Sequence, residues 1–363
     1  MNTQPLVNPP KGRILAIDFL KAMAIILVVF SHINAYNGSA KIWTICFAAN
    51  VFFFSHGVVC RSKIHKLSDW KDFILNRIVS ILAPYLIWGM IYSPLTAKNI
   101  VKLCYGSHES LSLADSLTSL WFLPCLFAGD LLFAGDLLFA LILWAAEQIK
   151  SPKGRLIFLT TVVAGILAVC PFLPHFSKGW PFGADVALQA AAWIGLGYLT
   201  MYLLKDRINP GTGKQTHPLV LVLIAAAGLA LSLTAFCNTS MPGGYVMMAE
   251  ARYGNYLLYL ASAAGGTAFV FALSFLLARI RNRFFVRSFQ LIGQSTMVIF
   301  AVHKFVIKTL QNVLTGIAIP HAAAAAVILI TAIGVSLCVM PFINTYLPLL
   351  AGKMKYKKVF GET

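Results

Sequence analysis

Charged side chains are scarce in this sequence. Asp, Glu, Lys and Arg make up 11% of the 363 residues, whereas a soluble globular protein carries about 25%. Hydrophobic residues make up 59%, and a soluble fold needs more polar surface than this composition supplies. These proportions exclude the soluble, disordered, collagenous and coiled-coil classes. We therefore predict an all-α polytopic membrane protein.

Acidic residues are especially few, and the cysteines form no recognisable motif. Twelve Asp and Glu stand against 29 Lys and Arg, a formal net charge of +17. The basic residues lie in short clusters between apolar runs, and no zinc-finger, RRM or helix-turn-helix pattern accompanies them, so nucleic-acid binding is not expected. The seven cysteines include no CxxC pair and no histidine at zinc-ligand spacing. Neither a metal site nor a disulfide framework is predicted.

Ten apolar stretches are long enough to cross a bilayer as helices, because the hydrocarbon core requires about 20 residues. They run from Ile14 to Asn34, Ile42 to Val59, Phe73 to Tyr92, Leu120 to Ala146, Leu156 to Leu173, Asp185 to Leu203, Pro218 to Phe236, Asn255 to Leu277, Leu291 to Leu314 and Ala322 to Leu347. An even number of spans places both termini on one side of the membrane.

The distribution of Lys and Arg between the spans predicts which side this is. Twenty lie in the termini and in alternate loops, and only five lie in the other loops: Lys41, Lys98, Lys102, Lys178 and Arg252. Loops rich in Lys and Arg stay in the cytoplasm, so both termini should be cytoplasmic. We expect a single integral-membrane domain, 1–363, with a cytoplasmic N-terminal tail, 1–13, and a basic cytoplasmic C-terminal tail, 351–363.

The first span carries three ionisable residues, which are costly inside a membrane and therefore suggest function. Asp18 and Lys21 are three residues apart and can neutralise each other on one helix face. His32 follows Lys21 by eleven residues, or three helical turns plus about 20°, so the two share a stripe with a rise of about 16 Å. A polar path into the membrane is one interpretation. In the other, Lys21 snorkels toward the cytoplasm and His32 is an interfacial residue.

Further polar residues occur in later spans. Arg77 lies about one turn inside the third span, where its planar fork suits phosphate or carboxylate. Ser295 or Thr296 precedes His303 at heptad-like spacing in the ninth span. His56 lies near the end of the second span, where an interfacial histidine is the simpler interpretation. A tandem FAGDLL repeat places two aspartates in the fourth span, to which no role is assigned: Asp130 and Asp136.

Six short segments follow one another in an order typical of one family of membrane enzymes. They are AIDFLKAMAIILVVFSH (Ala16 to His32), VFFFSHG (Val51 to Gly57), RIVSILAPY (Arg77 to Tyr85), SLWFLPCLF (Ser119 to Phe127), YGN (Tyr253 to Asn255) and GQSTMVIFAVH (Gly293 to His303). Together they resemble the acyltransferase-3 family of bacterial integral-membrane O-acyltransferases. In that family a basic residue, usually Arg, and a histidine stand in the first helix with ten residues between them. Lys21 and His32 have the same spacing. Ser80 stands where the family has a second Arg.

The resemblance implies transfer of an acyl group to a hydroxyl of a cell-envelope glycan in the bacterial inner membrane. The donor is most often cytoplasmic acetyl-coenzyme A, which acts as a substrate, and no permanently bound cofactor is expected. The acceptor would be O-antigen, capsule, exopolysaccharide or a lipid-linked sugar precursor. Separate polysaccharide-pathway proteins are expected partners, together with the lipid bilayer.

The same resemblance suggests roles for individual residues. His32 would be the base that takes the hydroxyl proton, or a nucleophile that carries the acyl group briefly. Lys21 and Arg77 would stabilise negative charge on the oxyanion or on the donor's phosphates. The loop before the third span would gather the donor or simply signal topology: Arg61, Lys63, Lys66 and Lys71. The residues expected to line the pore or the acceptor site are Asp18, His56, Trp121, Asn255, Ser295 and His303.

A transporter or flippase for a glycan or lipid intermediate is the alternative from a different class. There the buried polar residues would line a path rather than perform chemistry. Transporters commonly show inverted repeats and paired broken helices, and the sequence shows neither beyond the FAGDLL duplication.

Overall fold

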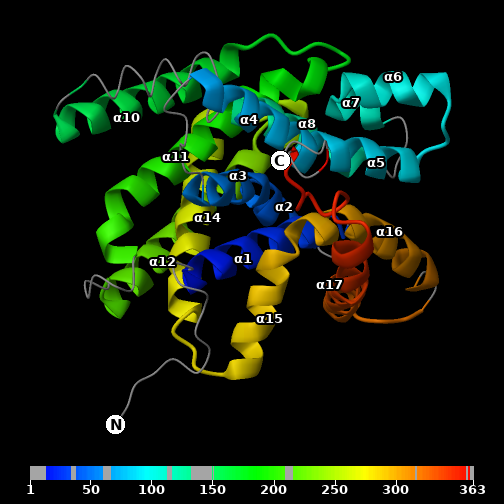
Figure 1. Ribbon diagram of the computed structural model, residues 1–363. Coiled ribbons are helices and arrows are strands. Elements are labelled where there is room, and N and C mark those ends of the chain that lie inside the picture. Colours follow the sequence, from blue (N-terminus) through cyan, green and yellow to red (C-terminus); the bar gives the residue numbers. More distant parts are fainter. Residues whose placement is uncertain are drawn as a thin grey trace. The chain divides into compact units, whose positions relative to one another are not determined.

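A computed structural model describes residues 14–33, 38–59, 67–112, 117–131, 149, 151–208, 216–314, 317–356 and 359. Within these ranges the regular structure is helical, with a single isolated bridge between Met247 and Arg252 (Figure 1). The longer elements are α1 (Leu15–Ser31), α2 (Gly38–Ile45), α3 (Ala48–Val59), α4 (Leu67–Arg77), the π-helical segment η1 (Ile78–Leu82), α5 (Ala83–Tyr92), α6 (Ala97–Tyr105), α7 (His108–Ser112), α8 (Phe122–Asp130), α10 (Pro152–Val169), α11 (Ala184–Ile208), α12 (Pro218–Ser232), α13 (Thr234–Ser240), α14 (Tyr256–Leu277), α15 (Arg283–Gln294), α16 (Thr296–Leu314) and α17 (His321–Tyr346).

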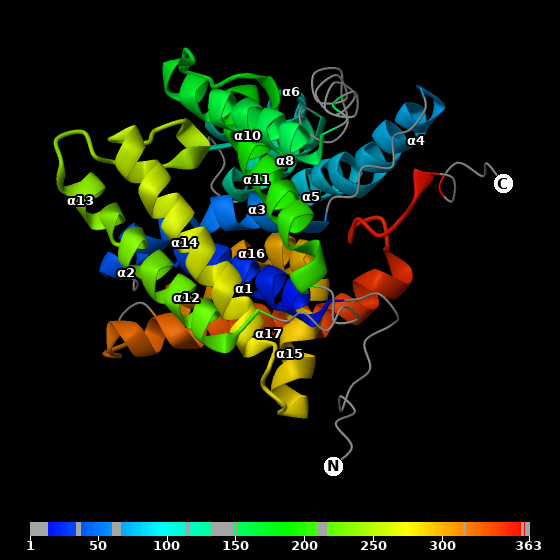
Figure 2. The same cartoon turned by 90° about the vertical axis from the view of Figure 1, so that its left-hand side faces the viewer.

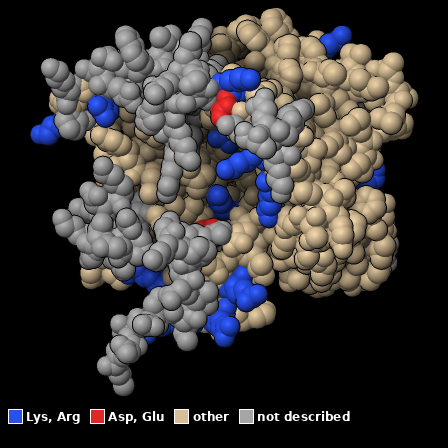
Figure 3. Space-filling model, viewed as in Figure 1, with Lys and Arg blue, Asp and Glu red and all other residues tan. Residues whose placement is uncertain are grey.

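Seven helical stretches of the described chain are long and apolar enough to cross a membrane. They coincide with seven of the ten predicted spans: Lys71–Tyr92, Lys153–Phe172, Pro181–Leu204, Pro218–Ser240, Tyr256–Leu277, Thr296–Leu314 and His321–Tyr346. The second predicted span corresponds to α2 and α3, which meet at a 41° bend. Counted together as one span, this pair raises the number of described membrane-crossing stretches to eight. On the face in Figure 3 most of the described surface is neither basic nor acidic. The prediction of an all-α polytopic membrane protein is confirmed.

The other two predicted spans are represented in part. The first corresponds to α1, which has 17 residues. The fourth begins with α8, and its later residues, Asp136 among them, lie outside the described ranges.

The predicted start of the ninth span, at Leu291, is wrong. The helix breaks at Ser295, where φ is −109° and ψ is 14°, and the membrane helix α16 begins at Thr296. The preceding helix, α15, is a separate amphipathic element with Arg283 at its start. Its apolar face packs on α1, because Phe289 stacks on the Phe19 ring at 4.9 Å between centroids.

The chain forms two compact units. The first comprises Met1–Val58, Thr200–Val246 and Gly254–Cys338. The second comprises Val59–Leu199, Met247–Tyr253 and Val339–Thr363. The prediction of a single domain covering 1–363 stays a prediction.

Close packing of α12 against α14 organises the first unit, and the two helices lie side by side in both views (Figures 1 and 2). Glycines permit the approach. A Cβ added to Gly228 would lie 2.7 Å from the Phe269 nitrogen, and one added to Gly265 would lie 2.6 Å from the Ser232 nitrogen. Small residues at such contacts are typical of helices that associate in a membrane. The same unit holds α1 against α14, α15 and α16.

A π-helical turn distinguishes the second unit at the end of α4. Pro84 has no N–H, and in a regular α-helix its ring would press on the carbonyl of Ser80. The backbone widens instead, and the Ala83 N–H donates to the Ile78 carbonyl five residues back. Such insertions are a recognised way to accommodate proline and often occur at functional sites. This turn follows directly on Arg77.

Part of the predicted C-terminal tail is ordered against α4 in the same unit. The Tyr356 hydroxyl donates to Asp72 at 2.5 Å, and its backbone N–H donates to Asn76 at 3.2 Å. Tyr356 is buried. Tyr356 therefore anchors the described part of the tail at the helix that carries Arg77.

Candidate active site

His32 ends α1, and one of its ring nitrogens is held by the helix itself. Nδ1 lies 2.7 Å from the Val28 carbonyl oxygen. A carbonyl only accepts hydrogen bonds, so Nδ1 must carry the proton. The neutral ring then presents its lone pair on Nε2. His32 is half-buried, and this is the protonation state that a general base requires.

His303 lies beside His32 and has the same arrangement. Its Nδ1 is 2.7 Å from the Phe300 carbonyl and 3.1 Å from that of Ile299, so Nε2 again bears the lone pair. The ring is fully buried. The centroids of the two imidazoles are 5.0 Å apart, with 64° between the ring planes. The structure thus brings together two residues that the sequence places on different spans.

Lys21 and Asp18 lie on α1, which continues without interruption to His32. Lys21 therefore keeps the predicted stripe with His32, and it is half-buried. Asp18 is buried, and its backbone carbonyl lies where a Cβ of Gly293 would be. The close contact of α15 with α1 thus depends on a glycine. The mutual neutralisation of Asp18 and Lys21 stays a prediction.

Two further lysines accompany the histidine pair and were missed by the sequence analysis. Lys304 and Lys41 are close enough for their charges to act on the His32 ring. From sequence, Lys41 counts only as a loop charge, and Lys304, which directly follows His303, carries no predicted role. The rule that cations inside a span suggest function would have identified Lys304. Both ammonium groups can stabilise an oxyanion that forms near His32.

Arg77, in the second unit, is paired with an aspartate for which the sequence suggested no role. Its Nε lies 3.1 Å from Oδ2 of Asp130, which is fully buried, whereas the Arg77 side chain is 24% exposed. The guanidinium also lies 5.0 Å from the centre of the Phe73 ring. A carboxylate buried in a membrane helix needs such a partner. Arg77 therefore has a structural role in addition to any contact with the donor.

The remaining members of the predicted donor loop are only partly described. Lys71 is exposed on α4. Arg61, Lys63 and Lys66 lie outside the described residues.

Two of the predicted lining residues have local structural roles. The Asn255 side chain caps α14 by accepting from the backbone N–H groups of Leu257 and Leu258, and Asn255 is exposed. Ser295 is buried at the start of α16, where its hydroxyl donates to the Leu291 carbonyl. His56 is half-buried on α3.

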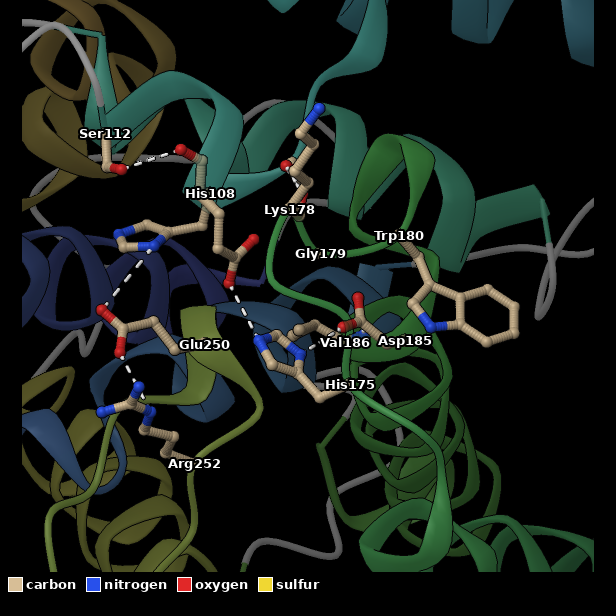
Figure 4. A network of polar contacts seen from close by, with 12 residues as sticks. His108, Ser112, His175, Lys178, Gly179, Trp180, Asp185, Val186, Glu250 and Arg252 are labelled. Atoms are coloured by element: carbon tan, nitrogen blue, oxygen red, sulfur yellow. Dashed lines mark hydrogen bonds and ion pairs between the residues drawn. The ribbon is translucent and has the colours of Figure 1, made fainter.

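Trp121, the last of the predicted lining residues, lies beside His108, with 6.2 Å between the ring centroids. His108 belongs to a polar network in the second unit (Figure 4). Nδ1 of His108 is 3.9 Å from Glu250, which also pairs with Arg252 at 3.4 Å. Short helices and turns from three separate loops meet here. The predicted topology places all three on the side opposite the termini.

A second histidine completes this network. His175 has Asp185 2.8 Å from Nδ1 and Glu109 3.4 Å from Nε2. Burial raises the pKa of Glu109, and the charges of Asp185 and Glu250 act in the same direction, while His175 opposes them. These residues could not be identified from sequence, because the paired residues are separated by up to about 140 positions. In the described chain no three His, Cys, Asp or Glu residues are arranged to hold a metal ion.

A family model described as an acyltransferase domain matches residues 14–342, nearly the whole chain. The chain belongs to the acyltransferase-3 family. No curated protein matches the sequence. This acyltransferase is therefore an enzyme that transfers acyl groups to oxygen, and its several apolar helices make it a multi-pass membrane protein.

Proposed function

We propose that this acyltransferase moves an acetyl group from cytoplasmic acetyl-coenzyme A to a hydroxyl of a cell-envelope glycan, in the bacterial inner membrane. The observation that carries the proposal is the Nε2 lone pair of His32, fixed by the bond from Nδ1 to the Val28 carbonyl. A neutral imidazole in this tautomer can take a hydroxyl proton near pH 7. Basic loops on the cytoplasmic side of the predicted topology suit an anionic donor that enters from the cytoplasm.

The reaction follows from these groups. His32 Nε2 takes the proton of the acceptor hydroxyl as its oxygen attacks the thioester carbonyl carbon. Negative charge develops on the carbonyl oxygen, where Lys41 and Lys304 can stabilise it. Lys21 lies about 16 Å from His32 along α1, too far to contact that oxygen. The carbon–sulfur bond then breaks, and the thiolate receives the proton from His32. The products are an O-acyl ester and free coenzyme A, and the enzyme returns to its starting state.

Arg77 is proposed to bind the phosphates of the donor. Its Nε is engaged by Asp130, but the guanidinium has further N–H donors in its fork. These remaining donors lie in one plane, a geometry that suits a phosphate. Lys71, exposed on the same helix, would add attraction for the anionic donor.

The proposal is tested in inverted membrane vesicles that contain the protein and the envelope glycans of its host. Acetyl-coenzyme A labelled in the acetyl group is compared with longer acyl-coenzyme A donors, and free thiol is measured together with label in the glycan fraction. Acetyl-coenzyme A is expected to release thiol and label the glycan in equal amounts. Thiol release with a longer donor alone would overturn the acetyl assignment, and glycan movement without thiol release from any donor would indicate a transporter.

A further inference from the structure

The buried Nε2 atom of His303 has no hydrogen-bond partner within the described part of the chain. Its side chain is fully buried. A buried nitrogen lone pair without a donor destabilises the fold, and native proteins seldom keep one without a use. The reaction proposed above brings a proton to the neighbouring ring.

The geometry of the two rings suits the sharing of one proton. Each Nδ1 is tied to its own helix, so each Nε2 lies on the side of the ring away from that backbone. The ring centroids are 5.0 Å apart. A ring atom lies about 1.2 Å from its centroid, so two nitrogens turned toward each other at this ring separation would be about 2.6 Å apart, close enough for a hydrogen bond.

His303 Nε2 makes no hydrogen bond to His32 in the described structure. Both Nε2 atoms carry lone pairs, and two lone pairs cannot bond to one another. One added proton converts the pair into a donor and an acceptor. His32 acquires such a proton when it deprotonates the acceptor hydroxyl.

We propose that His303 is a proton-sharing partner of His32, which holds on its Nε2 part of the proton that His32 removes from the acceptor. This inference rests on the proposed function. The proton passes from the hydroxyl oxygen to His32 Nε2, is shared with His303 Nε2, and returns through His32 to the leaving thiolate. No external acid or base is consumed. The full burial of His303 suits this role, since it acts through His32.

The arrangement spreads one positive charge over two rings. A charge confined to a single ring is costly in a membrane interior, where few dipoles solvate it. The ammonium groups that act on His32, Lys41 and Lys304, increase that cost in the transition state. The neutral His303 ring would reduce this cost by accepting part of the proton.

Chemical rescue tests the proposal in the full-length protein in vesicles. His303→Ala leaves a space for a small azole and is expected to lower kcat roughly 100-fold, with the KM values of both substrates near those of the wild type. Added imidazole should restore turnover, because it fills the space and accepts a proton. Pyrazole has the same shape but is much less basic and should not restore it. Equal rescue by the two azoles would show that His303 only fills space.

A second variant keeps the test decisive if His303→Ala fails to reach the membrane. His303→Gln keeps a polar side chain of similar length that cannot take a proton, and it should be as slow as His303→Ala. A wild-type rate in His303→Gln would overturn the proposal. Wild-type protein that releases no thiol from any acyl donor would instead refute the proposed function, before any variant is compared.

Discussion

His32→Ala is expected to abolish acyl transfer while leaving the amount of protein in the membrane unchanged. Positioned general bases contribute about 10²- to 10⁴-fold to rate, so the residual activity should fall below detection in most assays. His32 is only half-buried and lies at the end of α1, so its loss should not disturb the helices. The measurement is label transfer from acyl-coenzyme A in vesicles, normalised to the quantity of inserted protein.

His321→Ala is the matched control for this change. His321 is exposed at the start of α17, in the same unit as His32. It should retain full transfer activity. Activity in His32→Ala equal to that of the control would remove the assignment of His32 as the catalytic base.

Asp130→Ala is expected to destabilise the protein, and removal of both partners of the ion pair should largely restore it. The single change leaves Arg77 beside an apolar surface without its carboxylate. Breaking a buried ion pair costs about 3–5 kcal/mol, and the partial exposure of Arg77 places this case near the lower end. The double variant Arg77→Leu/Asp130→Leu leaves neither charge unpaired. Thermal unfolding in detergent measures both effects.

The double variant also separates the structural role of Arg77 from its proposed contact with the donor. Its stability should approach that of the wild type while KM for acyl-coenzyme A rises strongly, because the phosphate-binding fork is gone. Lys153→Leu, which removes an exposed cation from the same unit, should leave KM unchanged. A stable double variant with wild-type KM would mean that Arg77 serves only to neutralise Asp130.

The membrane spans could be predicted from sequence because each depends on local composition. A run of about 20 apolar residues has few alternatives to a helix in a bilayer, and α12, α14 and α17 lie where the pattern places them. The stripe that joins Lys21 and His32 is also local, since both residues belong to one helix. The break at Ser295 was missed because only the short GQST segment, 293–296, separates the last apolar residues of α15 from the first ones of α16.

The tertiary contacts of the site could not be predicted in the same way. Asp130 lies in a repeat with no distinguishing signal, and only the fold shows that it meets Arg77, 53 positions earlier. The approach of His303 to His32 joins α16 to α1. The network of His108, His175 and Glu250 joins three loops with no shared motif. Pair formation of this kind depends on helix packing, which sequence periodicity does not encode.

The central claim is most directly tested by mass spectrometry of the envelope polysaccharides of a deletion strain, complemented with the wild-type protein or with His32→Ala. The account predicts that an acyl substituent is lost on deletion, returns with the wild type and remains absent with His32→Ala. A change in the amount or location of the glycan, with no change in its substituents, would contradict the account and favour transport.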